Sequence, residues 1–380
     1  MGNADNVLFD NDSRVAPLGL IAMAGASELG KKVDGYLTKW ANENEFVKDT
    51  FLVEAVCPRF SSGDGKGLIK SSIRGDDLFI LCDVGNYSCT YNYFGRENSM
   101  SPDDHYQDLK RIIQAAGGKA HRINIIMPSL YGGRQHRRSA RESLDCAQML
   151  LELQNMGVAD IITFDAHDPR VQNAVPLMGF DNYFAHYQIL KCLTRRFPDV
   201  KLKKDSLMVI SPDEGAMTRN VFYASVLGLD LGMFYKRRDY STIINGRNPI
   251  VAHEYIGASV EGMNVFVADD MIATGDSILK LAKEIKEKGA KKVFLAATFS
   301  LFTEGVDKFN KAYQDGVFDA VLSTNLTYRI PELKECEWFV EADLSKYISY
   351  IIAAANVNES VANLLDPSQK IRELVDRLNG

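Results

Sequence analysis

The sequence predicts an α/β fold with mainly parallel sheets, and three observations support this prediction. Short apolar runs recur along the chain, helical patterns separate them, and polar residues follow directly after the apolar runs. Alternation of strands and helices is typical of parallel sheets, because the connection between parallel strands must cross a face of the sheet. With 380 residues, the chain exceeds the roughly 250–300 residues at which a single core stops growing, so we expect two domains.

The apolar runs define the candidate strands, and the spacing of apolar residues defines two helices. The candidate strands are residues 78–82, 123–127, 160–164, 207–210, 264–268 and 293–299. Residues 143–156 are predicted to be helical, with Gly157 as the stop. Residues 277–288 form a clearer amphipathic helix with Gly289 as its C-cap.

Composition excludes several classes of function. The net charge is −6, so we expect no sequence-independent binding of nucleic acid. The sequence contains no apolar run of membrane-spanning length. The six cysteines form no C-x-x-C pair, which favours buried free thiols in a reducing compartment. The N-terminal stretch lacks the basic start and apolar core of a secretory signal, so we expect a cytoplasmic protein.

Polar groups gather where the candidate strands end. The run PSLYGGRQHRRSAR follows 123–127, DAHDPR follows 160–164, SPDEG follows 207–210, and DDMIATGDS follows 264–268, while the apolar residues 231–235 lead into KRRD. Ligands of open parallel sheets bind at the carboxyl ends of the strands. These segments are therefore the candidate site.

The adjacent acids Asp269 and Asp270 are the most informative of these features. The pairs Asp76–Asp77 and Asp103–Asp104 are interpreted as turns or helix caps. Only Asp269–Asp270 ends an apolar strand and opens into a glycine turn, where two carboxylates are tolerable if they accept hydroxyl hydrogen bonds or face a cation.

The turn TGDS that follows is a fair helix N-terminus. Backbone N–H groups at such a terminus attract phosphate. An acid pair joined to a phosphate turn suits a phosphorylated sugar.

Two further features have a structural and a functional interpretation. His167 lies two residues beyond Asp165 at a strand end, and oxygen ligands with one imidazole suit Mg²⁺ or Mn²⁺ more than zinc. A lone histidine is more often an ordinary satisfied polar residue. The segment RQHRRSAR is either a solvated charged face or a phosphate-binding loop, and Gly132–Gly133 before it favours binding.

Taken in order, the motifs resemble those of the ribose-phosphate pyrophosphokinase family, also called phosphoribosyl-diphosphate (PRPP) synthetases. The similarity extends from about residue 20 to 350. It rests on six segments: FSSGDGKGLIKSSIRG (60–75), GRQHRR (133–138), DAH (165–167), SPDEG (211–215), KRR (236–238) and DDMIATGDS (269–277).

This resemblance implies two tandem phosphoribosyltransferase-type, Rossmann-like domains. We expect them at residues 1–187 and 188–352, with a C-terminal helix at 353–380. It also implies the transfer of the diphosphoryl group of ATP to the C1 hydroxyl of ribose 5-phosphate, which gives PRPP and AMP. Magnesium, with manganese possible in its place, and a homo-oligomer whose nucleotide site lies at a subunit interface belong to the same expectation.

The resemblance also implies a role for each matching residue. Lys236 and Arg238 would stabilise the transferring group, and His167 and Asp213 would contact the metal. ATP would be held by Phe60, Asp64, Arg134, Gln135 and His167. Ribose 5-phosphate would be held by Asp269, Asp270, Ala273, Thr274, Gly275, Asp276 and Ser277.

Four residues depart from the family pattern. Ala273 replaces an aspartate, Asp276 a glycine, Ser62 an acid, and His136 an aspartate. A carboxylate at position 276 is expected to weaken phosphate binding unless it points away or caps the helix. Two alternatives stay open: a phosphoribosyltransferase that uses PRPP, and a non-catalytic regulatory homologue of the synthetases.

Overall fold

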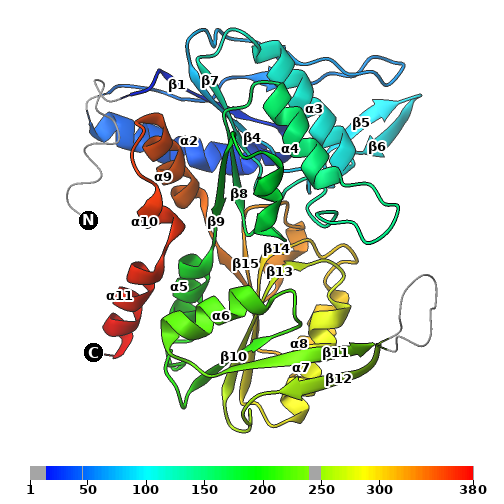
Figure 1. Ribbon diagram of the computed structural model, residues 1–380, viewed down its shortest axis with the longest axis vertical. Helices are drawn as coiled ribbons and strands as arrows, with labels where there is room; N and C mark the ends of the chain where they lie inside the picture. The colour runs from blue at the N-terminus through cyan, green and yellow to red at the C-terminus, as the bar shows by residue number, and fades with distance from the viewer. Residues whose placement is uncertain (1–13, 45, 239–249, 380) are drawn as a thin grey trace. The chain divides into compact units, whose positions relative to one another are not determined.

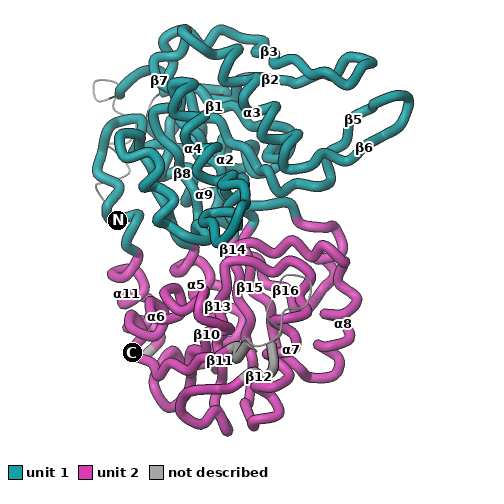
Figure 2. Tube along the Cα trace, turned by 45° about the vertical axis from the view of Figure 1, so that its right-hand side comes forward, with its two compact units in different colours: residues 1–184, 325–328, 343–366 teal, residues 185–324, 329–342, 367–380 magenta. Residues whose placement is uncertain are grey.

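The structure, a computed structural model, describes residues 14–44, 46–238 and 250–379, without the side chains of residues 236–238, 250–253 and 379. It confirms the α/β fold with mainly parallel sheets. The chain forms two compact units (Figure 2). Unit 1 comprises residues 1–184, 325–328 and 343–366, and unit 2 comprises residues 185–324, 329–342 and 367–380. The domain boundaries predicted at 187/188 and 352/353 stay a prediction.

Unit 1 is built around a sheet of strand order β1-β4-β7-β8-β9, in which each neighbouring described pair is parallel. The strands are β1 (Leu18–Ala22), β4 (Asp77–Leu81), β7 (Arg122–Ile126), β8 (Asp160–Phe164) and β9 (Gly179–Tyr183). The helices are α2 (Ser27–Glu43), α3 (Pro102–Ala116), α4 (Asp145–Asn155), α9 (Ser345–Asn356) and α10 (Ala362–Leu365), with the short turns η1 (Ala24–Ala26) and η2 (Pro169–Ala174). Two small antiparallel pairs are added: β2 (Ala55–Val56) with β3 (Leu68–Ile69), and β5 (Thr90–Tyr93) with β6 (Arg96–Ser99).

Helices cover both faces of this sheet. On one face, alternate strand residues such as Ile80 and Ile125 join a buried cluster with Leu109 of α3 and Leu150 of α4. On the other face, α9 packs on α2, and Tyr347 of α9 contacts the ring of Phe164 at the end of β8. Figure 1 shows α3 and α4 together on one side of the strands. The strands are therefore buried on both sides, which explains their nearly continuous apolar runs.

Asp77 anchors the amino end of the sheet. It is fully buried and accepts hydrogen bonds from Arg122 at 2.8 and 2.6 Å, from Asn124 at 2.8 Å and from Asn356 at 3.0 Å. The interpretation of this residue as a turn or cap is wrong, because Asp77 is the first residue of β4 and its carboxylate joins β7 to the end of α9. The cap interpretation is confirmed at Asp104, which forms a capping box at the start of α3.

A second buried carboxylate fixes a late segment of the chain within unit 1. Asp83, just after β4, is 2% exposed. It accepts hydrogen bonds from the Thr327 hydroxyl at 3.1 Å, from the Tyr328 N–H at 2.9 Å and from the Gly85 N–H at 2.9 Å. These bonds compensate for the loss of water around the carboxylate and hold residues 325–328 at the carboxyl end of β4.

Unit 2 contains a larger sheet of strand order β12-β11-β10-β13-β14-β15-β16, in which β12 runs antiparallel to β11 and the other described pairs are parallel. Its strands are β10 (Leu207–Ser211), β11 (Leu231–Arg238), β12 (Ile250–Ile256), β13 (Asn264–Ile272), β14 (Lys292–Ser300), β15 (Ala320–Thr324) and β16 (Phe339–Ala342). Its helices are α5 (His186–Arg196), α6 (Met217–Leu227), α7 (Asp276–Glu287), α8 (Asp307–Gln314) and α11 (Ser368–Asn379), with the turn η3 (Pro331–Glu335). Helices α7 and α8 pack against one face of the sheet, and the core between them is rich in aromatic residues.

The predicted strands and helices are confirmed, and two predictions need correction. Strand β13 continues past residue 268 to Ile272, because β14 continues to pair with it as far as Ser300. The segment 353–380 is not one helix: it contains the end of α9, then α10 and α11. Asp366 is extended before Pro367, since proline disfavours the helical conformation of the preceding residue.

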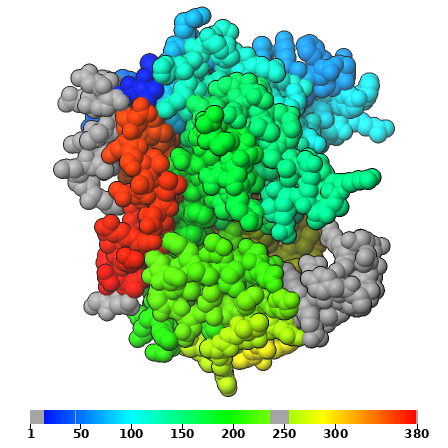
Figure 3. All heavy atoms as spheres, in the orientation of Figure 1, coloured from blue at the N-terminus to red at the C-terminus, as the bar shows by residue number. Residues whose placement is uncertain are grey.

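Helix α11 lies at the surface of unit 2, where it is drawn in red in Figure 3. Its buried residues Ile371 and Leu374 lie on the side where it packs against α5 and α6. Among the described helices, none is both long and apolar enough to cross a membrane.

Candidate active site

The carboxyl ends of two adjacent strands form the first part of the site. Strand β10 is hydrogen-bonded to β13, so the loop that follows β10 lies beside the polar end of β13. Asp213 belongs to the β10 loop, where its carboxylate accepts a hydrogen bond from the Ala216 N–H at 3.2 Å. Asp269 and Asp270 occupy the last part of β13. The structure thus brings together the acids that the sequence predicted at two separate strand ends.

Helix α6 contributes two residues that the sequence analysis missed. The Asn220 side chain is buried. It donates to the Ala268 carbonyl at 2.7 Å and accepts from the Ala268 N–H at 3.2 Å. Arg219 lies with its guanidinium 3.8 Å from the Asp269 carboxylate. Both residues lie about one helical turn after the SPDEG segment. This position close to a predicted site segment could have identified them as site residues.

The described side chains of this cluster carry an excess of negative charge. Partial burial, and next the charge of Asp270, raises the pKa of Asp269, while Arg219 opposes the rise and Asp213 adds to it. Among the described side chains of this cluster, the Arg219 guanidinium accompanies the three carboxylates of Asp213, Asp269 and Asp270. Such an arrangement favours a cation or hydroxyl donors as its ligand. Within the described residues, no group of three or more His, Cys, Asp or Glu side chains is arranged to hold a metal ion by itself.

The segment 301–309 packs against the turn between β13 and α7 and stabilises it. The Thr303 N–H donates to the Ala273 carbonyl at 3.1 Å. Gly275 has φ +91° and lies on the Phe309 ring, where a Cβ would be 2.3 Å from ring carbons. Only glycine meets both conditions. The helix N-terminus at Asp276 and Ser277 is therefore presented to solvent by a fixed backbone.

Asp276, one of the four departures from the family pattern, has charged and polar partners. Its carboxylate accepts hydrogen bonds from Lys308 at 2.7 Å and from the Thr274 hydroxyl at 2.9 Å. The hydrogen bond from Lys308 lowers the pKa of Asp276. Lys308 also pairs with Glu304. The negative charge at position 276 is thus offset by a lysine that the six motifs do not contain.

For ribose 5-phosphate, the substrate that the resemblance implies, replacing Lys308 with alanine is therefore expected to increase KM by about two- to fivefold, the range typical of an exposed charge pair. The carboxylate of Asp276 would then repel the phosphate. The double variant Lys308→Ala/Asp276→Gly should return KM towards the wild-type value in steady-state assays. An equal effect of Lys308→Ala with and without Asp276 would contradict this explanation.

In unit 1, the loops after β7 and β8 meet at the carboxyl edge of the sheet. The rings of His136 and His167 have centroids 5.2 Å apart. His136 Nε2 lies 3.6 Å from the Asp168 carboxylate. The Gln135 side chain donates to the Ser143 carbonyl at 2.8 Å, which connects the two ends of the loop after β7. Arg134, Arg137 and Arg138 are exposed, so the loop after β7 presents cationic side chains, and His167 is exposed on the loop after β8.

The turn that carries His167 is strained. Asp165 is 3% exposed and has φ +45°, a conformation that costs a non-glycine residue free energy and that recurs at functional sites. Hydrogen bonds of the next strand fix it: the Asp165 N–H donates to the Tyr183 carbonyl at 2.8 Å, and the Ala166 N–H donates to Asn182 at 3.0 Å. The Arg170 side chain lowers the pKa of Asp168 to about 2.

The predicted nucleotide loop, residues 60–64, is exposed, and its backbone forms a closed turn. The Phe60 side chain is 53% exposed. The Phe60 N–H donates to the Asp64 carbonyl at 2.7 Å, and the Asp64 carboxylate accepts from the Ser62 hydroxyl at 2.8 Å. Lys236 and Arg238 belong to β11 by their backbone. Their side chains lie outside the described part of the structure.

Comparison with known proteins identifies the family. Residues 18–157 match the N-terminal domain of ribose phosphate pyrophosphokinase, and residues 185–319 match the phosphoribosyl transferase domain. A ribose-phosphate pyrophosphokinase of Ralstonia nicotianae is 30% identical over 258 residues, which cover 67% of this chain and 72% of that protein. The chain belongs to the ribose-phosphate pyrophosphokinase family.

The similarity to this family extends over nearly the whole chain. A ribose-phosphate pyrophosphokinase of Chlorobaculum tepidum is 29% identical over 361 residues, which cover 93% of this chain and 98% of that protein. The solved phosphoribosylpyrophosphate synthetase of Mycobacterium smegmatis has a TM-score of 0.70 at 22% identity and covers 90% of this chain and 99% of that chain. At this identity the structural match supports the fold, with two phosphoribosyltransferase-type domains.

Proposed function

We propose that the protein is a ribose-phosphate diphosphokinase, an enzyme that transfers the diphosphoryl group of ATP to the C1 hydroxyl of ribose 5-phosphate and releases PRPP and AMP. One observation of the structure carries this proposal. The acid pair at the end of β13 lies beside Asp213 and leads directly into the fixed turn at the start of α7. This arrangement suits a ligand with hydroxyls at one end and a phosphate at the other.

In this proposal, ribose 5-phosphate binds along the end of β13. Asp269 and Asp270 accept hydrogen bonds from the ribose hydroxyls. Backbone N–H groups of residues 273–277 bind the 5-phosphate at the positive end of the α7 dipole. The Thr274 and Ser277 hydroxyls add donors. Support comes from the fixed backbone of Gly275 and from the compensation of Asp276 by Lys308.

The acidic cluster fits a magnesium ion. Mg²⁺ in such enzymes is usually bound by one or two carboxylates together with substrate phosphates and water. Burial raises the pKa of Asp269 most, and the neighbouring charges of Asp270 and Asp213 raise it further; a divalent cation would offset this repulsion. We propose Asp213 as a protein ligand in unit 2 and, from the resemblance, His167 as a metal ligand in unit 1. Manganese has the same preference for oxygen ligands with one imidazole. When bound, the ion would neutralise charge on the diphosphoryl oxygens.

Positioning and charge neutralisation account for most of the rate in phosphoryl transfer. We assign the neutralising cations to Lys236 and Arg238, at the end of β11. Arg134, Gln135 and His167 would hold ATP, together with Phe60 and Asp64. The exposure of Phe60 supports a nucleotide site completed by another subunit of a homo-oligomer. The proposed location is the cytoplasm.

The alternatives are less well supported. A PRPP-using phosphoribosyltransferase needs one domain of this type, whereas both domains match here and the relatives of similar length are named pyrophosphokinases. A non-catalytic homologue would be expected to lose Lys236, Arg238, His167 or Asp213, and all four residues are present.

The test is an assay of the purified protein with ATP, ribose 5-phosphate and Mg²⁺. We expect AMP and PRPP to appear in equal amounts and only when ribose 5-phosphate is added, which separates transfer from ATP hydrolysis. Absence of AMP over hours with folded protein would contradict the proposal. Consumption of added PRPP with a nucleobase would instead support the phosphoribosyltransferase alternative.

A further inference from the structure

The β5–β6 hairpin of unit 1 lies against the predicted nucleotide loop and belongs to none of the six motifs. In Figure 1 it projects from the edge of this unit. Tyr91 and Tyr93, two residues apart on β5, share one face of the strand. The Tyr91 ring lies 5.0 Å from the Arg59 guanidinium, and the Tyr93 ring covers Gly63. The hairpin therefore contacts the loop at both ends.

The contact between Tyr93 and Gly63 is specific in shape. Gly63 has φ +94°, and a Cβ at this position would be 2.4 Å from Tyr93 Cε2. The ring thus fills the space that any other side chain would need. Residues 60–62 are exposed, and a loop with so few buried apolar contacts is ordered mainly by what it packs against. Tyr93 provides that support.

The other end of the loop is fixed by an ion pair. Arg59 forms two hydrogen bonds to the Asp108 carboxylate, at 2.8 and 2.9 Å, and both side chains are 7% exposed. Asp108 belongs to α3, so this pair connects the loop to the body of unit 1. Tyr91 covers the guanidinium from the hairpin side. The five-residue loop is consequently held between a rigid helix and the hairpin.

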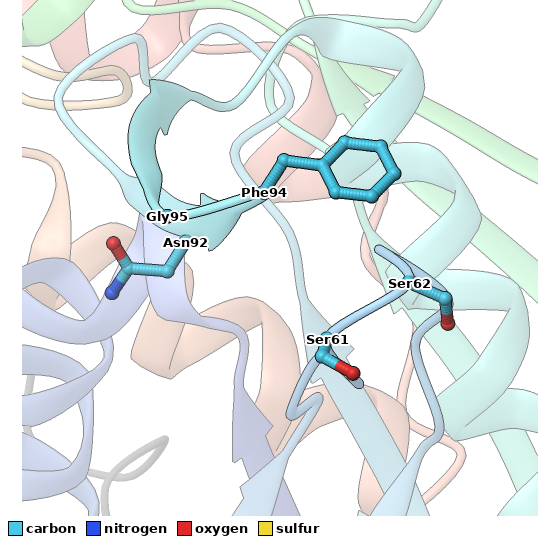
Figure 4. Close-up of a pocket in the computed structure, with 5 residues that line it drawn as sticks. All are labelled: Ser61, Ser62, Asn92, Phe94 and Gly95. Atoms are coloured by element: carbon cyan, nitrogen blue, oxygen red, sulfur yellow. The ribbon is translucent and has the colours of Figure 1, made fainter.

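A pocket of about 570 Å³ opens between the loop and the tip of the hairpin (Figure 4). It is lined by Ser61 and Ser62 of the loop and by Asn92, Phe94 and Gly95 of the hairpin. In Figure 4, Phe94 lies on the same side of the pocket as Ser62, and the Asn92 amide lies across from them. An aromatic ring beside hydroxyl and amide groups suits a flat heterocycle with polar edges.

Phe94 occupies an unfavourable backbone position. Its φ is +48° and that of Gly95 is +72°, and they are the two residues of the hairpin turn between Tyr93 and Arg96. Such turns strongly favour asparagine and glycine, and a bulky residue at positive φ is an outlier. The side chain is nevertheless 75% exposed, and its described ring contact is with Tyr93 at a centroid distance of 4.4 Å, so burial does little to compensate for the strain. A ligand contact would account for the phenylalanine.

We propose that the β5–β6 hairpin is part of the nucleotide site. Tyr93 is a positioning residue that keeps the 60–64 loop in its binding conformation, and Phe94 with Asn92 contacts the purine base of the nucleotide. This proposal rests on the proposed function, which assigns ATP to Phe60 and Asp64. It adds residues that contact the base. These residues contribute to the affinity for the nucleotide and do not change the affinity for ribose 5-phosphate.

The first test is the variant Tyr93→Ala, measured by steady-state kinetics and by calorimetric titration with ATP alone. Loss of the support should raise the KM and the Kd for ATP about tenfold, because the loop must then be ordered on binding. The kcat and the KM for ribose 5-phosphate should stay near the wild-type values. Tyr93→Phe, which keeps the ring, should restore ATP binding.

The second test, Phe94→Gly, separates binding from stability. Glycine tolerates φ +48°, so the melting temperature should rise slightly, while ATP affinity falls about two- to tenfold with the lost aromatic contact. Asp205→Gly is the matched control, since Asp205 is exposed, has φ +64° and belongs to unit 2. It should increase stability without changing ATP affinity.

The outcomes distinguish this inference from the proposed function. Unchanged ATP binding in folded Tyr93→Ala and Phe94→Gly would overturn the hairpin's role, even if the wild type makes PRPP. Hairpin-dependent ATP binding without PRPP formation would support the hairpin's role and contradict the diphosphokinase proposal. A wild type that does not bind ATP would overturn both. Equal increases of both KM values would indicate general distortion and would also overturn the hairpin's role.

Discussion

Replacing Lys236 with alanine is expected to lower kcat by about 10²–10³-fold, the typical effect of removing one group that stabilises charge in the transition state. ATP affinity should change far less, because the proposed contact strengthens only as the diphosphoryl group transfers. Single-turnover rates and direct ATP titration measure the two effects separately. The prediction depends on the assignment of Lys236 from the KRR segment at the end of β11.

Arg237→Ala is the matched control for this variant. Arg237 lies between the two residues with a proposed catalytic role and has the same charge as Lys236. It should keep most of the activity if the effect is specific to position 236. A loss of ATP affinity as large as the loss of kcat in Lys236→Ala would argue against a role in the transition state.

Replacing Asp77 with alanine should cause the largest loss of stability, about 3–5 kcal/mol, as expected when one partner of a buried ion pair is removed. Arg122, Asn124 and Asn356 would all lose their common acceptor. Since domains are stable by only about 5–15 kcal/mol, unit 1 should be close to unfolding. Urea denaturation followed by circular dichroism measures the effect.

The neighbouring residue provides the control for Asp77→Ala. Asp76→Ala removes the other carboxylate of the same Asp-Asp pair, and Asp76 is only partly buried. Its effect should be within about 0.5 kcal/mol, as for most surface substitutions. Similar losses for both variants would show that the hydrogen-bond network of Asp77 is not the cause.

The sequence was most informative about local structure and strand ends. Apolar runs located β8 and β10 because parallel strands that are buried on both faces have nearly continuous apolar sequences. The pairing of β10 with β13 then places Asp213 beside Asp269. The same reasoning missed Lys308 and the hairpin residue Tyr93. Their roles depend on contacts with Asp276 and Gly63, residues about thirty positions away, which no local pattern encodes. Asp77 was misinterpreted for the same reason, since Asn356 lies near the other end of the chain.

Unit 1 is assembled from segments that are far apart in the chain, and this has a consequence for the synthesis of the protein. Helix α9 covers one face of its sheet and buries Ile348, Ile351 and Ile352, yet the ribosome makes it after most of unit 2. While unit 2 is being translated, the nascent chain carries the completed strands β1 to β9 without this cover. Exposed apolar strands of this kind promote aggregation. The protein is thus expected to depend on chaperones at this stage, and a fragment that ends at Phe184 should be poorly soluble.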